Sequence, residues 1–156
     1  MKTKKKLSIW LPPFIWMALI YLFSTSGFSE ENTASFLLPI LNALFPEASQ
    51  ATLSKIHSFI RKSGHFIEFA ILSLLWVRTL RKEWEERHDP FYIVSFSLSV
   101  IYAIVDEFHQ SFVSERTASF LDIFIDSAGA ASSLFLLKIY VISRNWKGLR
   151  RKGLKD

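Results

Sequence analysis

The chain has 156 residues, enough for one domain, and half of them are hydrophobic, including 15 Phe and five Trp. It contains no cysteine, which excludes disulfide bonds and thiolate metal sites. The net charge is +5, but Lys and Arg gather beside long apolar runs and do not form the basic folded surface that nucleic acid requires. This distribution indicates a membrane protein and argues against a nucleic-acid partner.

Residues 7–23 are nearly all apolar and predict the first membrane span, with Trp10 and Trp16 suited to the interface. The basic start of this run is also typical of a signal peptide. However, the run lacks a clean small-x-small cleavage site and contains Pro12-Pro13, so we favour a retained helix. The prolines lie near the start of the helix, where a missing N–H costs least.

The connection that follows, residues 24–60, is expected to carry a helix of its own. Residues 32–45 are too short to span and too apolar for a free loop, which predicts an interfacial or re-entrant segment between the first two spans. Ser49 is a candidate N-cap for a further helix that runs into the second span.

Three more spans are predicted at about residues 64–80, 91–110 and 119–142. A span needs about 20 residues, and two of the four candidates reach that length only by counting polar ends. The predicted fold class is therefore an all-α integral membrane protein with four transmembrane helices in a single domain, residues 1–156. The last twelve residues, 145–156, form a basic tail, solvated or lying on anionic headgroups.

Orientation follows from the basic residues. Lys and Arg are in excess before the first span, across residues 78–88 and after the fourth span. The positive-inside rule places these segments, and so both termini, in the cytoplasm of a multi-pass protein of the cell membrane. Residues 24–60 and 112–119 then face outside.

This topology brings three polar groups to the outer membrane face. Ionisable groups at such depth cost about 2.5–3.5 kcal/mol each on insertion scales, so they are seldom there by accident. Spacings of three, four or seven residues predict shared helical faces for three sets of side chains, although Glu107 lies about 100° around from Asp106. The three sets are Arg61, His65 and Glu68; Asp106, His109 and Gln110; and Asp122 and Asp126. The groups are Arg61, Lys62, His65 and Glu68; Asp106, Glu107, His109 and Gln110; and Arg116, Asp122 and Asp126.

The charges of this cluster need compensation. Five carboxylates face three Lys or Arg side chains, so the cluster approaches neutrality only when His65 and His109 are both protonated. Otherwise it suits one divalent cation or a cationic ligand. Pairing of Asp122 and Asp126 with Arg116 is an equally weighted structural explanation, and His57 reads as an ordinary loop or interfacial residue.

We assign candidate roles on this basis. Carboxylates and histidine are candidates for proton transfer, and the cations with the neighbouring polar groups are candidates for anion binding. The acids together with His109 are candidates for binding a divalent cation. The candidate catalytic residues are His65, Glu68, Asp106, Glu107 and Asp126. The candidate ligand-binding residues are Arg61, Lys62, Gln110, Arg116 and Asp122. The candidate metal ligands are Glu68, Asp106, Glu107, His109, Asp122 and Asp126.

The same residues carry a resemblance to a known family. The elements are Arg-Lys-x-x-His at 61–65, Asp-Glu-x-x-Gln at 106–110 and Asp-x-x-x-Asp-x-x-Gly at 122–129, with Arg116 between the last two. In this order they resemble the VanZ-like family of small bacterial membrane proteins, over about residues 21–137. The chain departs from the family at 113–116, where it has Val-Ser-Glu-Arg in place of a Val-Pro-Gly-Arg-like turn, and at Ser133, where a second glycine is common.

The resemblance implies a protein of the cell envelope, in a family named for a protein associated with low-level teicoplanin resistance. Two functions remain open. In the first, the outer site binds or modifies an amphipathic envelope molecule, such as a membrane lipid or lipid-linked precursor. In the second, the charges form a structural network in a module that binds a partner or excludes a drug. Proton-coupled transport ranks last because the inner halves of spans one and three are largely apolar. A homodimer is compatible with a chain this small.

Overall fold

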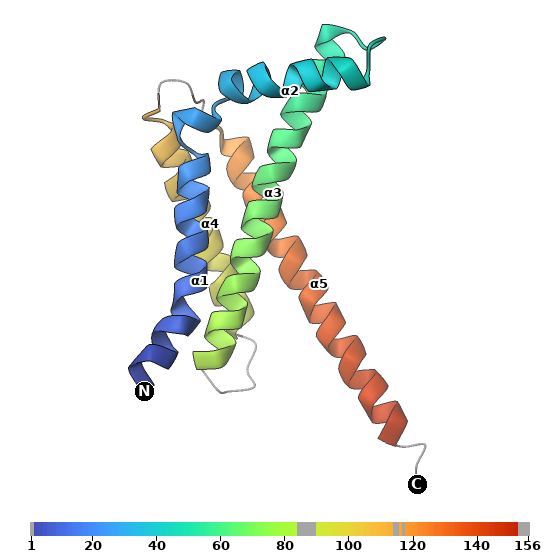
Figure 1. The fold of residues 1–156 in the computed structure, drawn as a ribbon. Coiled ribbons are helices and arrows are strands. Elements are labelled where there is room, and N and C mark those ends of the chain that lie inside the picture. Colours follow the sequence, from blue (N-terminus) through green and yellow to red (C-terminus); the bar gives the residue numbers. More distant parts are fainter. Residues whose placement is uncertain (1, 84–89, 114–115, 117, 153–156) are drawn as a thin grey trace.

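The computed structural model describes residues 2–83, 90–113, 116 and 118–152, with side chains described only within residues 7–144. All regular structure in these ranges is helical, which confirms the all-α prediction (Figure 1). The elements are α1 (Lys2–Phe23), a short 3-10 helix η1 (Ser26–Phe28), α2 (Glu30–Leu44), α3 (Gln50–Glu83), α4 (Pro90–Gln110) and α5 (Phe120–Lys152).

Length and composition identify two helices that can cross a membrane by themselves, Pro90–Gln110 and Phe120–Arg144. Leu7–Phe23 and Ser26–Leu44 pass the same test only as a bent pair, which would make a third span. The four predicted spans are therefore not all supported. Polar residues interrupt α3 at both ends, from Arg61 to Glu68 and from Arg78 to Lys82, and leave it a short apolar middle.

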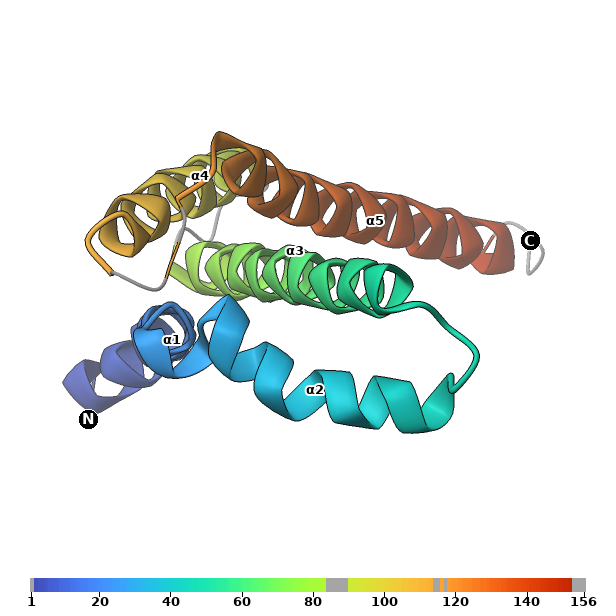
Figure 2. The same cartoon turned by 90° about the horizontal axis from the view of Figure 1, so that it is seen from above.

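The short helix predicted between the first two spans is α2, and it begins slightly earlier than expected. Ser29 caps it, accepting a hydrogen bond from the Asn32 amide at 3.2 Å. Its axis is bent by 71° from that of α1, and it crosses the end of the helical bundle (Figures 1 and 2). Leu41 packs inward while Phe36 is 73% exposed, as in a helix with one apolar face left for lipid.

Helix α3 is the centre of the bundle and packs against α1, α2, α4 and α5. Ser49 caps its start as predicted, and its side chain accepts a hydrogen bond from the backbone N–H of Thr52 at 3.2 Å. Its apolar middle supplies Phe69, Leu72 and Trp76 to the core, joined by Ile20 of α1 and Ala103 of α4.

Small residues let α5 approach α3 closely. Gly129 is buried, and the Ser73 and Ser133 hydroxyls are 2.7 Å apart between the two helices. The core therefore fixes the relative positions of α3, α4 and α5, and with them the polar residues at one end of the bundle. The basic tail predicted at 145–156 begins as a continuation of α5 to Lys152.

Candidate functional site

Two adjoining cavities lie at the end of the bundle crossed by α2. Their volumes are about 260 Å³ and about 430 Å³, and Arg61, His65 and Arg116 line both of them. Glu68 adds a carboxylate to the smaller cavity. The larger cavity is more polar, and its other charged lining residues are Glu30, Glu31, His57, Lys62 and Asp122.

Arg61 and Arg116 donate hydrogen bonds to the linker between α1 and α2. Arg61 Nη1 lies 3.3 Å from both the Phe28 carbonyl oxygen and Thr33 Oγ1 and donates to them. The Arg116 guanidinium donates to the carbonyl oxygens of Phe23 and Thr25. Burial, and then the nearby positive charge of Arg61, lower the pKa of Arg116 below the usual value for an arginine.

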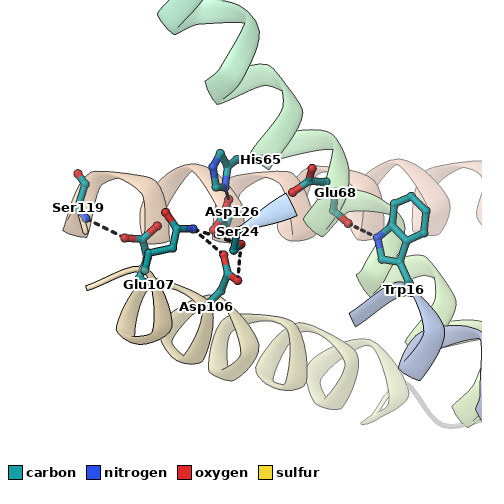
Figure 3. Close-up of polar contacts among 9 residues, drawn as sticks. Trp16, Ser24, His65, Glu68, Asp106, Glu107, Ser119 and Asp126 are labelled. Atoms are coloured by element: carbon teal, nitrogen blue, oxygen red, sulfur yellow. Dashed lines mark hydrogen bonds and ion pairs between the residues drawn. The ribbon is translucent and has the colours of Figure 1, made fainter. Parts of the chain in front are cut away.

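Arg116 is not paired with Asp122 or Asp126 in the described part of the chain, so the structural pairing considered for it is wrong. Asp126 instead faces His65, whose Nδ1 lies 3.5 Å from Asp126 Oδ1 (Figure 3). Asp126 is fully buried, whereas His65 keeps 14% of its side chain exposed. Among the described residues, neither Asp126 oxygen has a closer hydrogen-bond partner. His65 therefore stands between the cavities and a buried carboxylate that can orient it.

Asp106 and Gln110 form a buried group behind the cavities and connect α4 to Ser24, the residue that follows α1. Asp106 accepts hydrogen bonds from Ser24 Oγ at 2.6 Å and from Gln110 Nε2 at 2.8 Å (Figure 3). Ser24 also lines the smaller cavity. Asp106 is thus a well-satisfied carboxylate, which favours a positioning role over proton transfer.

Glu107 accepts a backbone hydrogen bond at the start of α5. Its Oε2 accepts the backbone N–H of Ser119 at 2.7 Å, one residue before α5 begins (Figure 3). Its other oxygen has no hydrogen-bond partner in the described residues. His109 lies apart from the two cavities, with its ring 4.3 Å from that of Tyr21.

The structure thus gathers some predicted residues at the cavities and separates others. Arg61, Lys62, His65, Glu68, Arg116 and Asp122 line them, Asp126 contacts one of these residues, and Asp106, Gln110 and Glu107 support the surrounding helices. No group of three or more His, Asp or Glu among the described residues could hold a metal ion. The candidate metal ligands therefore do not form a common coordination shell there.

His57 and Thr33 belong to the site although the sequence did not indicate it. His57 is buried, with Nε2 3.1 Å from Thr33 Oγ1, so it is not the ordinary loop or interfacial residue expected. Burial, and then the charge of Arg61, lower the pKa of His57 from 6.5, while Glu30 raises it. The four-residue spacing from His57 to Arg61 was the available signal, since it places both side chains on one face of α3.

Comparison with known proteins identifies the family of the chain. Neither the curated proteins nor the solved structures give a match to the chain. The family model described as VanZ/LLP1 matches residues 9–141. This range covers all the helices apart from the first residues of α1 and the last residues of α5. The matched region also contains all the residues that line the two cavities. The chain therefore belongs to the VanZ/LLP1 family.

Proposed function

We propose that this protein binds an amphipathic cell-envelope molecule by an anionic group of its headgroup at the two adjoining cavities. The observation that carries the proposal is that Arg61, Arg116 and His65 line both cavities. Guanidinium groups bind phosphate and carboxylate through charge-assisted, often bidentate hydrogen bonds. Both arginines are already held by backbone carbonyls, so little side-chain entropy is lost when an anion binds.

The apolar part of the ligand also has a place. Phe23 and Phe28 line the smaller cavity, with ring centroids 5.1 Å apart. Phe36 on α2 and Phe59 on α3 are both more than 70% exposed at the same end of the molecule. The apolar chain of a lipid-linked headgroup could lie along these aromatic surfaces as it enters the bilayer, whereas a free polar anion would make no use of them. An amphipathic ligand therefore fits better than a soluble one.

The proposal includes a topology in which α1, α3, α4 and α5 all cross the membrane. In Figure 1 these helices run between the two ends of the bundle while α2 lies across one end. The basic segments at the start of α1 and at the end of α3 lie at the other end, which the positive-inside rule assigns to the cytoplasm. The cavities would then open at the outer membrane face, where envelope precursors and glycopeptides are found.

His65 gives the site a capacity for proton exchange. It is the titratable group that both lines the cavities and contacts buried Asp126, an arrangement that orients an imidazole as a general base. If the bound molecule is modified, His65 is the residue we assign to the proton transfer. The resemblance to a family named for teicoplanin resistance extends the proposal to a contribution to glycopeptide or lipoglycopeptide resistance.

A second candidate function is a non-enzymatic module whose charged cluster is purely structural. The hydrogen bonds of both arginines to carbonyls of the α1–α2 linker favour it, because these bonds alone stabilise a helix end. Such a module would act by binding a partner or excluding a drug, and its cavities would bind no lipid.

The two functions are separated by lipid binding to the full chain. Native mass spectrometry would compare retention of a polyprenyl phosphate with retention of the matching uncharged polyprenol. We expect at least tenfold preference for the phosphate, or about 1.4 kcal/mol, as two arginines at partly desolvated positions should provide. Equal retention of both lipids would support the structural module instead.

A further inference from the structure

We propose a second lipid site, for an anionic glycerophospholipid, at the end of the bundle opposite to the two adjoining cavities. A cavity of about 510 Å³ lies there between α3 and α5. Figure 1 shows these helices crossing and then separating toward the C-terminal end of α5. The lining residues are Leu74, Val77, Arg78, Arg81 and Lys82 of α3 and Leu137 of α5.

The order of these residues along α3 matches the parts of a phospholipid. Leu74 and Val77 come first, nearer the middle of the bundle, and the three cations follow in the next turn and a half. At 1.5 Å of rise per residue, Leu74 and Lys82 are separated by about 12 Å along the helix. Acyl chains would contact the apolar part and the phosphate the basic part.

The apolar floor is built into the core. Val77 is 2% exposed and packs with Leu80, Phe91 and Leu134, and Leu137 packs against the same cluster. The cavity is therefore walled by side chains that the fold already fixes. A pre-formed cavity of this kind binds a ligand at a lower entropic cost than a surface that must first order.

The positive charge of the lining residues favours an anionic headgroup. Arg78, Arg81 and Lys82 are spaced by three and four residues, so they share a face of α3, and all three are exposed. Arg81 is held in place by the Phe91 ring, 5.5 Å from its guanidinium carbon. The lining residues that the structure describes include three cations and no carboxylate. Basic cavities between membrane helices favour anionic lipids over zwitterionic ones in this way.

The site is independent of the proposed function, since none of its described lining residues also lines the cavities that contain Arg61 and Arg116. Under the proposed topology it opens to the cytoplasmic leaflet. Acidic residues at 83, 85, 86 and 89 follow in the sequence, so the test must address the cavity and not the net charge of this end.

The experiment uses the full chain in mixed micelles with equimolar phosphatidylglycerol and phosphatidylcholine, and measures retained lipid by native mass spectrometry. The charge variant is Arg78→Gln with Lys82→Gln. The matched control is Lys55→Gln with Arg144→Gln, which removes the same charge at exposed positions that do not line this cavity. A third variant, Leu137→Trp, fills the cavity without changing its charge.

We expect the wild type and the control to retain phosphatidylglycerol in preference to phosphatidylcholine. The charge variant should lose about fivefold or more of that preference, as expected when cations near an anionic lipid are removed. Leu137→Trp should reduce retention of the anionic lipid, and a cooperative thermal unfolding transition checks that this variant still folds. The proposal is overturned if the two lipids are retained equally by the wild type, or if the charge variant loses no more preference than the control.

Discussion

Gly129 shows how a single residue places the site. A Cβ atom added there would lie 2.1 Å from the Phe66 carbonyl oxygen of α3, far inside van der Waals contact. Asp126 is three residues before Gly129 on α5, and His65 immediately precedes Phe66 on α3. The close approach of the two backbones therefore also sets the distance between His65 and Asp126.

Gly129→Ala should destabilise the protein by about 1–3 kcal/mol, because α3 and α5 must separate to admit the methyl group. Gly64→Ala is the matched control, since a Cβ atom at Gly64 meets nothing within 4 Å. The free energy of unfolding, measured by denaturant titration in micelles, should decrease for Gly129→Ala and should stay the same or increase for Gly64→Ala. Equal values would contradict the close approach.

The buried carboxylate of Asp106 is a second test at this scale. Asp106→Ala leaves the Ser24 hydroxyl and the Gln110 amide without their acceptor, which should cost about 1–3 kcal/mol of unfolding free energy. A double-mutant cycle with Ser24→Ala isolates their interaction. Strictly additive losses in the cycle would show that Ser24 and Asp106 do not interact.

Residue types and spacing predicted which polar groups sit at the end of the bundle, but not their partners. Asp106 and Ser24 are 82 residues apart in the chain, and helical periodicity carries no information about contacts over such a separation. The same limit explains the mistaken pairing of Arg116 with the α5 acids. His57 was misjudged because its burial depends on α2, a neighbouring helix whose packing the sequence does not specify.

At the scale of elements, α2 forms one wall of the larger cavity. Near the cavities, His57 and Arg61 of α3 are hydrogen-bonded to Thr33 of α2. The sequence predicted this helix because an apolar run too short to span still needs an apolar surface. The angle of α2 was not predictable, because it follows from the capped turn at Ser29 and from Arg61 and Arg116 holding the linker.

The contact of α2 with α3 should weaken in acid. Burial lowers the pKa of His57 from 6.5, so the unfolded chain takes up a proton at a higher pH than the folded one. This contribution to stability is therefore present above about pH 6.5 and is lost as the pH falls through the folded-state pKa. Nearby Arg61 adds repulsion once the imidazole is charged, and Glu30 partly offsets it.

Hydrogen exchange of the α2 amides, corrected for intrinsic rates, measures this effect. Exchange should be faster at pH 5.5 than at pH 7.5 in the wild type. His57→Gln keeps a polar partner for Thr33 but cannot titrate, so its exchange should not depend on pH. A pH dependence that survives in His57→Gln would assign the effect to another group.

For the whole molecule, composition and hydropathy predicted the helical class and most helix ends, while the number of spans stays a prediction. A helix such as α3 has too little uninterrupted apolar length to pass a test of composition alone. Arg61 and His65 of α3 are accommodated by contacts with other parts of the chain, which is a property of the assembled bundle and not of any one segment.

The proposed topology is directly measurable because the chain has no cysteine of its own. Single cysteines at Ser35 on α2 and at Ser143, near the end of the candidate span in α5, replace exposed side chains. A membrane-impermeant maleimide applied to intact cells should label Ser35→Cys, and should label Ser143→Cys only after permeabilisation. Labelling of both or of neither in intact cells would contradict the proposed orientation.

The most direct test of the proposed function is to fill the smaller cavity from its wall. Gly64 lines that cavity in open space, so Gly64→Phe blocks it without removing a charge or a hydrogen bond. Ile67→Phe, at a 54% exposed position on the same helix, is the matched control. We expect binding of polyprenyl phosphate, measured as a dissociation constant in micelles, to weaken about tenfold or more for Gly64→Phe and to stay unchanged for Ile67→Phe. Wild-type affinity in Gly64→Phe would contradict the proposal that this cavity is the binding site.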